Sequence, residues 1–215
     1  MKILAINGSP RKKWNTVTLL EKALEGAVSV GAETELVHLY DLNYKGCISC
    51  FACKLKGGES YGKCAVKDGL APVLDKVSTV DALILGSPIY FGTVTGEMHS
   101  FMERLLFQYL VYTRPPGSLF GRNIRTALIC TMNVSEELMN EYQYPVHIGL
   151  NENVLRRTFG DAETLCSFET LQFDDYDKVV FSYFDPEQRR ERRRTVFPED
   201  CRKAFDLGAR LVSQP

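Results

Sequence analysis

The chain has 215 residues, of which 45% are hydrophobic and 25% are charged, and its formal net charge at pH 7 is −1. This composition is typical of a globular protein with a substantial core. A net charge near zero gives no general attraction to phosphate backbones, so we expect no nucleic-acid partner. The first apolar run, in MKILAINGSP, is too short for a signal peptide or a membrane span. We therefore expect a cytoplasmic protein that does not contact a membrane.

Five short apolar segments predict buried strands at residues 2–7, 34–39, 80–86, 125–130 and 162–168. Their content of β-branched residues and leucine, without strict alternation, is typical of parallel strands covered on both faces. Segments with helical periodicity lie between them, for example the apolar positions of 17–28, 98–105 and 204–211. Strands that alternate with helices predict right-handed βαβ units and a doubly wound α/β fold.

Three stretches interrupt this alternation. They are a cysteine-rich segment at about 44–67, a Pro/Gly loop at 113–123 and a polar, aromatic segment at about 172–197 that contains QRRERRR. The last is too long for a simple connection after a strand. We interpret all three as insertions in a single domain that spans residues 1–215. The arginine run has two interpretations: a site for the extra phosphate of NADPH or for an acidic partner, or a solvated or subunit-contacting surface.

The first predicted strand is followed directly by GSPRKKWNT at 8–16. Gly8 permits a tight turn, and Ser9 and Thr16 offer hydroxyl groups next to the start of a helix. The amides and positive end of that helix, together with nearby basic residues, favour an anion. The segment lacks the glycine patterns of a P-loop and of a dinucleotide-binding turn, so it fits a single phosphate better. The alternative is an ordinary polar turn.

The third predicted strand is followed by GSPIYFGTVTGEM at 86–98. Tyr90 and Phe91 stand there among glycines, which allow a flat ring to approach the backbone closely. With the strand order 2-1-3-4-5, the ends of the first and third strands are neighbours. A phosphate site beside an apolar slot predicts FMN. The alternative is that both aromatic residues pack into the core.

These two loops, GSPRKKWNT and GSPIYFGTVTGEMHSFMER, resemble the flavin loops of the NAD(P)H-dependent FMN reductase-like family. CISCFAC with Cys64 resembles the iron–sulfur flavoprotein branch of that family, and TMNVSEE at 131–137 stands where a third flavin loop is expected. The resemblance covers residues 1–110 with specific motifs. It implies a flavodoxin-like five-stranded parallel sheet with helices on both faces, and FMN bound without a covalent link. It also implies NAD(P)H or a protein as electron donor, a small molecule or a protein as acceptor, and a homodimer or homotetramer.

The resemblance also implies which residues bind the cofactor. One group would hold the phosphate, a second would face the flavin ring and a third would lie near its rim. The expected residues are Ser9, Arg11, Asn15, Thr16 and Val17, then Pro88, Ile89, Tyr90, Phe91 and Gly92, then Thr131, Met132 and Asn133. Trp14, His99 and Glu103 depart from the family pattern, outside the positions that face the ligand. We expect no side chain to act as a catalytic acid or base.

Cys47, Cys50 and Cys53 are spaced C-x2-C-x2-C, which is typical of a four-iron cluster site. Cys64 supplies a fourth candidate ligand after a glycine-rich stretch of ten residues, a longer gap than is usual in the family. Zinc is an alternative, although it more often takes paired cysteines. Two further alternatives are a reactive thiol pair activated by nearby lysines and a loop that holds no metal. 

Together these patterns predict an FMN-dependent oxidoreductase. It would be an NAD(P)H:FMN or quinone reductase, or an iron–sulfur flavoprotein that transfers electrons. The alternatives are a non-enzymatic electron carrier of the flavodoxin type and a flavin module that senses redox state through its thiols. The last two differ from the first because they would not turn over with NADH or NADPH.

Overall fold

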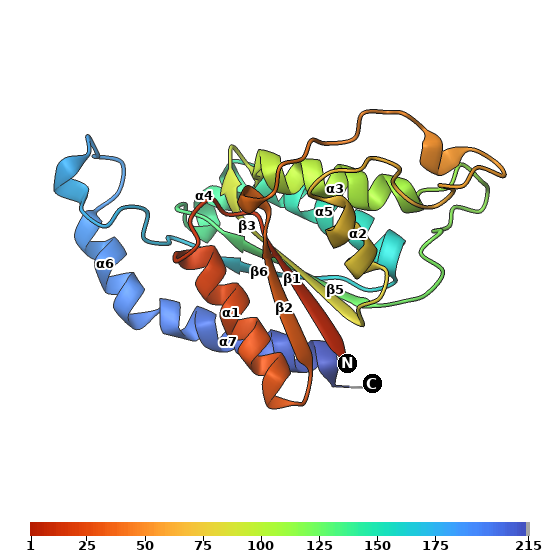
Figure 1. Ribbon diagram of the computed structural model, residues 1–215. Helices are drawn as coiled ribbons and strands as arrows, with labels where there is room; N and C mark the ends of the chain where they lie inside the picture. Colours follow the sequence, from red (N-terminus) through yellow and green to blue (C-terminus); the bar gives the residue numbers. More distant parts are fainter. Residues whose placement is uncertain (214–215) are drawn as a thin grey trace.

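The computed structural model describes residues 1–213, so the last two residues of the expected domain lie outside it. Five parallel strands form the central sheet (Figure 1): β1 (Lys2–Asn7), β2 (Glu33–His38), β3 (Ala82–Tyr90), β5 (Arg125–Thr131) and β6 (Glu163–Ser167). Their order is β2-β1-β3-β5-β6, and the short β4 (Thr93–Val94) pairs antiparallel with β3. Counting the parallel strands alone, this is the expected order 2-1-3-4-5. The predicted flavodoxin-like α/β fold is confirmed.

Both faces of the sheet are covered, which explains the nearly continuous apolar sequence of its strands. Along β1, Ile3 and Ala5 belong to one buried cluster, whereas Leu4 and Ile6 belong to another on the opposite face. Successive side chains of a strand point to opposite faces, so a strand that is buried on both sides needs apolar residues at every position.

Two helices cover one face of the sheet, α1 (Asn15–Ser29) and α7 (Phe197–Val212). The other face carries α2 (Ala71–Val77), α3 (Gly96–Tyr109) and α5 (Tyr144–Phe159). The short α4 (Glu136–Glu141) precedes α5, and α6 (Pro186–Thr195) extends away from the sheet before α7 (Figure 1). Single 3₁₀ turns occur at Leu39–Asp41, Ala52–Lys54 and Tyr176–Lys178.

Helices α1 and α7 cross where each has a glycine. A Cβ atom added to Gly26 would lie 1.9 Å from the carbonyl oxygen of Phe205, and one added to Gly208 would lie 1.7 Å from that of Ala23. No side chain fits at these distances, so the two backbones touch directly. This contact fixes the C-terminal helix against the helix that follows the first loop.

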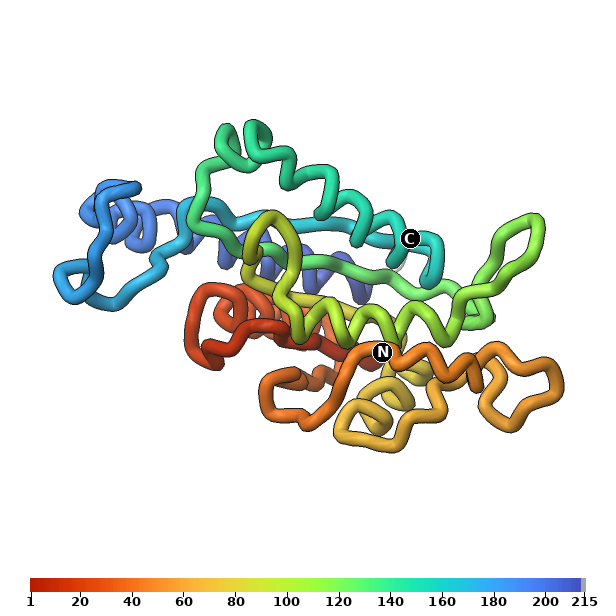
Figure 2. Tube along the Cα trace, turned by 90° about the horizontal axis from the view of Figure 1, so that it is seen from above, coloured from red at the N-terminus to blue at the C-terminus, as the bar shows by residue number. Residues whose placement is uncertain are grey.

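The structure differs from the sequence-based expectations at three places. Strand β3 continues past Gly86 to Tyr90, because residues 89–90 pair with β4 in a short hairpin. The cysteine-rich segment lies along α3 (Figure 2) and reaches the end of that helix through Lys54, whose Nζ donates to the carbonyl oxygen of Leu110 over 2.6 Å. The arginine run forms α6, and it is not simply a solvated surface, because Arg189 is only 2% exposed.

None of the helices in residues 1–213 combines the length and the apolar character that crossing a bilayer requires.

Candidate functional site

A pocket of about 140 Å³ opens at the carboxyl ends of β1, β3 and β5. Three chain segments that are far apart in the sequence meet there. Ten of the thirteen expected cofactor-binding residues line it: Ser9, Arg11, Asn15, Thr16, Pro88, Ile89, Tyr90, Thr131, Met132 and Asn133. The other three lie elsewhere: Val17 is a buried residue in the first turn of α1, and Phe91 and Gly92 lie at the tip of the β3–β4 hairpin.

The first loop is held in shape by buried polar contacts. The side chain of Asn7 accepts from the amide of Ser9 and donates to its carbonyl oxygen, each over 3.0 Å. The amide of Gly8 donates to the carbonyl oxygen of Gly86 over 2.8 Å, and the hydroxyl of Thr95 donates to the carbonyl oxygen of Gly8 over 2.7 Å. The first and second loops are therefore fastened to each other at the base of the pocket.

Helix α1 begins at the pocket without a side-chain cap. Trp14 occupies the cap position and makes no capping hydrogen bond, and the first turn contains no acidic residue. The first amides of a helix have no partner within it, so the positive end of α1 is free to bind an anion. Thr16 is buried there, and its hydroxyl lies 2.7 Å from that of Thr131 on β5. Lys12, one of the basic residues of the first loop, pairs with Asp41 and does not line the pocket.

The hairpin of β3 and β4 presents aromatic residues at the open side of the pocket. Tyr90 is 46% exposed and Phe91 is fully exposed. Phe91 has a φ of 51°, and Gly92 follows with a φ of 88°, so the turn holds both residues in the left-handed region. Tyr90 and Phe91 are therefore not packed into the core, which was the alternative. Aromatic side chains that are exposed at a strained turn beside a pocket favour a flat ligand.

A fourth segment, residues 170–172, also lines the pocket, and the sequence did not predict it. The carbonyl oxygen of Leu171 accepts from Trp14 Nε1 over 2.9 Å and from Asn15 Nδ2 over 2.8 Å. The side chain of Gln172 accepts from Asn133 Nδ2 over 2.8 Å. We call residues 170–172 the strap. It explains why Trp14 departs from the family pattern, since the indole fastens the strap to the first loop.

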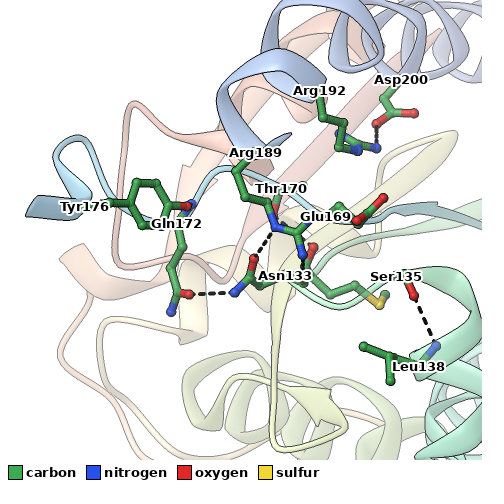
Figure 3. Close-up of polar contacts among 11 residues, drawn as sticks. Asn133, Ser135, Leu138, Glu169, Thr170, Gln172, Tyr176, Arg189, Arg192 and Asp200 are labelled. Carbon is green, nitrogen blue, oxygen red and sulfur yellow. Dashed lines mark hydrogen bonds and ion pairs between the residues drawn. The ribbon is translucent and has the colours of Figure 1, made fainter. Parts of the chain in front are cut away.

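Helix α6 reaches the third loop next to the strap through Arg189 (Figure 3). Arg189 donates from Nε to Asn133 Oδ1 over 3.2 Å and from Nη2 to the carbonyl oxygen of Asn133 over 3.1 Å. Its Nη1 pairs with Glu169, and its guanidinium lies 4.2 Å from the ring centre of Phe184. A buried arginine therefore fixes the third loop. The only signal in the sequence was the position of a polar segment after the last strand, at the same edge of the sheet.

The four expected metal ligands line a second, separate cavity of about 20 Å³ beside α3. Cys53 is buried, Cys47 and Cys64 are half-buried and Cys50 is exposed. The amide of Cys47 donates to Glu103 over 3.0 Å. In residues 1–213 no three Cys, His, Asp or Glu side chains are placed as ligands of one metal ion. The cysteines thus gather in one place, but their side chains do not converge on a single point.

Within residues 1–213, two buried donors beside these cysteines have no hydrogen-bond partner, Arg104 Nε and Gln108 Nε2. The other nitrogens of Arg104 reach Asp68 and the carbonyl oxygens of Lys45 and Val66. Unpaired buried donors are costly, and they are rare unless something that is absent accepts from them. Thiolate or sulfide sulfur carries negative charge and accepts hydrogen bonds, so these donors fit a thiolate-ligated centre.

Burial raises the pKa of the Cys53 thiol, the thiolates of Cys64, Cys50 and Cys47 would raise it further, and Lys54 only partly opposes them. In the absence of metal this thiol is therefore protonated at neutral pH.

A larger apolar groove of about 380 Å³ lies between α3 and α5, and it shares Phe107 with the cysteine cavity. Met102, Leu106, Leu150 and Val154 supply apolar walls. It shares no lining residue with the pocket at the strand ends, so we do not assign it to flavin binding.

Comparison with known proteins gives a consistent picture. The family model for NADPH-dependent FMN reductase matches residues 1–127. An iron–sulfur flavoprotein of Archaeoglobus fulgidus is 45% identical over 104 residues, which are 48% of this chain and 48% of that protein. One of Methanocaldococcus jannaschii is 39% identical over 104 residues, 48% of this chain and 51% of its own. The matches thus span about half the length of these curated relatives.

Solved structures agree in fold over nearly the whole chain. An NAD(P)H:quinone oxidoreductase from Methanothermobacter marburgensis superposes with a TM-score of 0.72 at 15% identity, covering 98% of both chains. An FMN-dependent NADH-azoreductase from Bacillus anthracis, solved in complex with FMN, gives a TM-score of 0.67 at 12% identity, covering 99% of this chain and 100% of its own. At these identities the similarity establishes the fold.

Proposed function

The chain belongs to the NADPH-dependent FMN reductase family, and from that premise we propose that it is an oxidoreductase that binds FMN in the pocket at the strand ends. The observation that carries the proposal is that the uncapped start of α1 and the exposed Tyr90–Phe91 hairpin border the same pocket. FMN has one phosphate and one flat ring, and it thus matches both features.

The residues of the pocket have separate roles in this proposal. Ser9, Thr16 and the first amides of α1 bind the phosphate, and Arg11 adds positive charge. The pocket of about 140 Å³ is smaller than the roughly 300–1,000 Å³ of sites that enclose a whole cofactor. We therefore place the phosphate end inside the pocket and the ring outside it, over Tyr90 and Phe91.

Bound FMN would supply the chemistry, accepting electrons from a donor and passing them to an acceptor. The protein itself would orient the cofactor and shield its inner face from water. No lining side chain is placed as a dedicated acid or base. The proposed donor is NADPH or NADH, and the proposed acceptors are a quinone, free flavin or a redox protein.

We further propose that Cys47, Cys50, Cys53 and Cys64 hold an iron–sulfur cluster, as the names of the relatives suggest for those proteins. The unpaired donors of Arg104 and Gln108 support this assignment. The cavity of about 20 Å³ holds about one water, so a cluster requires the loop to open. Cys50 is exposed, which leaves that side of the loop free to move outward. Such a cluster would pass electrons one at a time.

Self-association is part of the proposal as well. Leu150 lines the groove between α3 and α5 and is 57% exposed, and Val146, on the same helix, is 58% exposed. Apolar side chains at a groove of this size favour contact with another protein surface. Light scattering during size-exclusion chromatography would show a dimer or tetramer, and conversion of the wild type to a monomer by Leu150→Glu would support this groove as the interface.

One experiment tests the main proposal. The protein is purified without oxygen, its flavin is released and identified, and the holoprotein is titrated anaerobically with NADPH and with NADH. Bleaching of the flavin absorbance by a nicotinamide supports a reductase. FMN that is bound but is reduced by neither nucleotide identifies an electron carrier or a sensor instead. A protein that takes up no FMN from solution contradicts the proposal altogether.

A further inference from the structure

Helix α6 lies beyond residue 127, where the match to the family model ends. It nevertheless reaches the pocket at two points. Arg189 contacts Asn133 of the third loop, and Arg193 contacts Asn15 at the start of α1. Both asparagines line the pocket and both are also bonded to the strap. The helix thus closes a ring of contacts around the outer side of the pocket.

The contact of Arg193 is made to a neutral group. Its Nη1 donates to Asn15 Oδ1 over 2.9 Å, and its guanidinium lies 4.0 Å from the ring centre of Phe197. The side chain is half-buried. Burial lowers the pKa of Arg193, although an arginine keeps its charge at any pH near neutrality.

In the part of the chain that the structure describes, no salt bridge neutralises the charge of Arg193, unlike those of its neighbours on α6. Arg189 pairs with Glu169, and Arg192 pairs with Asp200 over 2.6 Å (Figure 3). On the outer side, Arg190 and Arg194 pair with Glu187. Within residues 1–213, no carboxylate lies within 4.0 Å of the Arg193 side chain.

Asn15 passes the effect of this charge to the pocket. Its Oδ1 accepts from Arg193 while its Nδ2 donates to Leu171, so both ends of the amide are fixed. Asn15 is also the first residue of α1, where the backbone amides are free to bind an anion. A cation on the oxygen side polarises the amide and raises the positive potential at the start of the helix.

We propose that Arg193 is a positioning residue for the phosphate group of the flavin: it fixes Asn15 and adds an uncompensated positive charge behind the first turn of α1. This inference rests on the proposed FMN function and names the group that makes the pocket prefer a phosphorylated flavin. Arg189 differs, because Glu169 neutralises it. It supports the third loop without favouring a phosphate.

The test compares FMN with riboflavin, which has the same ring and no phosphate. Dissociation constants for both flavins are measured by fluorescence titration of flavin-free wild type, Arg193→Gln, Arg193→Lys and Arg189→Gln. Arg194→Gln is the matched control on the outer side of the same helix. Circular dichroism and the thermal midpoint show whether each variant is folded.

We expect Arg193→Gln to weaken FMN binding roughly tenfold and riboflavin binding less than about twofold, as for the loss of one charge-assisted contact. Arg193→Lys keeps most of the preference for FMN, and Arg189→Gln weakens both flavins by similar factors. The outer-side control Arg194→Gln matches the wild type.

Equal weakening of FMN and riboflavin in Arg193→Gln, or no change in either, would overturn the inference and leave the FMN function standing. A wild type that bound neither flavin would overturn both. The same ratio of the two dissociation constants in Arg193→Gln and Arg194→Gln would likewise contradict a specific role for Arg193.

Discussion

Arg193 and Asn15 are 178 positions apart in the sequence, yet a hydrogen bond of 2.9 Å joins them. The bond connects the C-terminal part of the chain to the first turn of the first helix. The glycine contact of α1 with α7 holds the two segments at this distance, since α6 leads directly into α7. The stability of the helix pair and the shape of the pocket are therefore linked.

The helix crossing gives a stability prediction. Gly26→Ala and Gly208→Ala each place a Cβ atom less than 2 Å from a backbone oxygen, so we expect each to lower the free energy of unfolding by about 3 kcal/mol or more. Gly149 lies within α5 and has no atom within 4 Å of an added Cβ. Gly149→Ala should raise the free energy of unfolding by about 0.5–1 kcal/mol. Urea titrations measure all three, and equal effects at Gly149 and Gly208 would contradict the observed crossing.

The hydroxyl of Thr16 gives a binding prediction. Thr16→Val keeps the shape of the side chain but removes the hydroxyl that contacts Thr131, so we expect FMN to bind about tenfold more weakly. The matched control is Thr126→Val, at the other end of β5. It removes a buried hydroxyl that donates to the carbonyl oxygen of Asp161 over 2.6 Å. Both variants should lose about 1 kcal/mol of stability. Equal FMN affinity in the two variants would remove Thr16 from the phosphate site.

The cysteine cavity gives a prediction of metal content. Protein purified without oxygen should contain about four iron and four sulfide per chain if it holds a four-iron cluster. Cys64→Ala should lose most of both, whereas Cys201→Ala, on α7, should keep them. Zinc in place of iron, or iron that is unaffected by Cys64→Ala, would show that these four residues do not ligate a cluster.

The ion pair beneath the cysteine segment gives a pH prediction. Burial alone would raise the pKa of Asp68, but the Arg104 guanidinium and the amide of Leu70 hold it below its usual value of about 3.9. A carboxyl group whose pKa is lower in the folded state than in the unfolded state stabilises the fold at pH values above its unfolded-state pKa. We therefore expect this contribution to be complete above about pH 5 and to be lost as the pH falls below about 4.

Asp68→Asn should remove this part of the pH dependence and lower the free energy of unfolding at pH 7 by about 2–3 kcal/mol, because the buried Arg104 loses its partner. Asp75→Asn is the matched control, since Asp75 forms an exposed ion pair with Lys63. It should lower the free energy of unfolding by less than about 1 kcal/mol. Urea midpoints measured from pH 3 to pH 7 compare the two variants. Parallel curves for wild type and Asp68→Asn would show that the pair does not carry the effect.

Local patterns were sufficient for the five parallel strands, for helices α1, α3 and α7 and for most of the pocket. The apolar runs of β1 and β3 and the loops after them could be read directly, because strand burial and turn chemistry depend on residues that are adjacent in the sequence. The strand order also predicted that these two loops lie next to each other. The strap and the contacts of Trp14 could not be read in this way, because Leu171 lies 157 positions from Trp14.

The sequence by itself determined the alternation of strands and helices, the family, the loops that line the pocket and the spacing of Cys47, Cys50 and Cys53. Only the tertiary structure decided that Arg189 is buried, that Arg193 meets Asn15, and that Arg104 and Gln108 direct unpaired donors toward the cysteines. The physical reason is that an arginine in a polar run has the same sequence signature whether it faces water or a neutral amide. Its partner depends on where the fold places α6. That placement depends on packing between residues far apart in the chain.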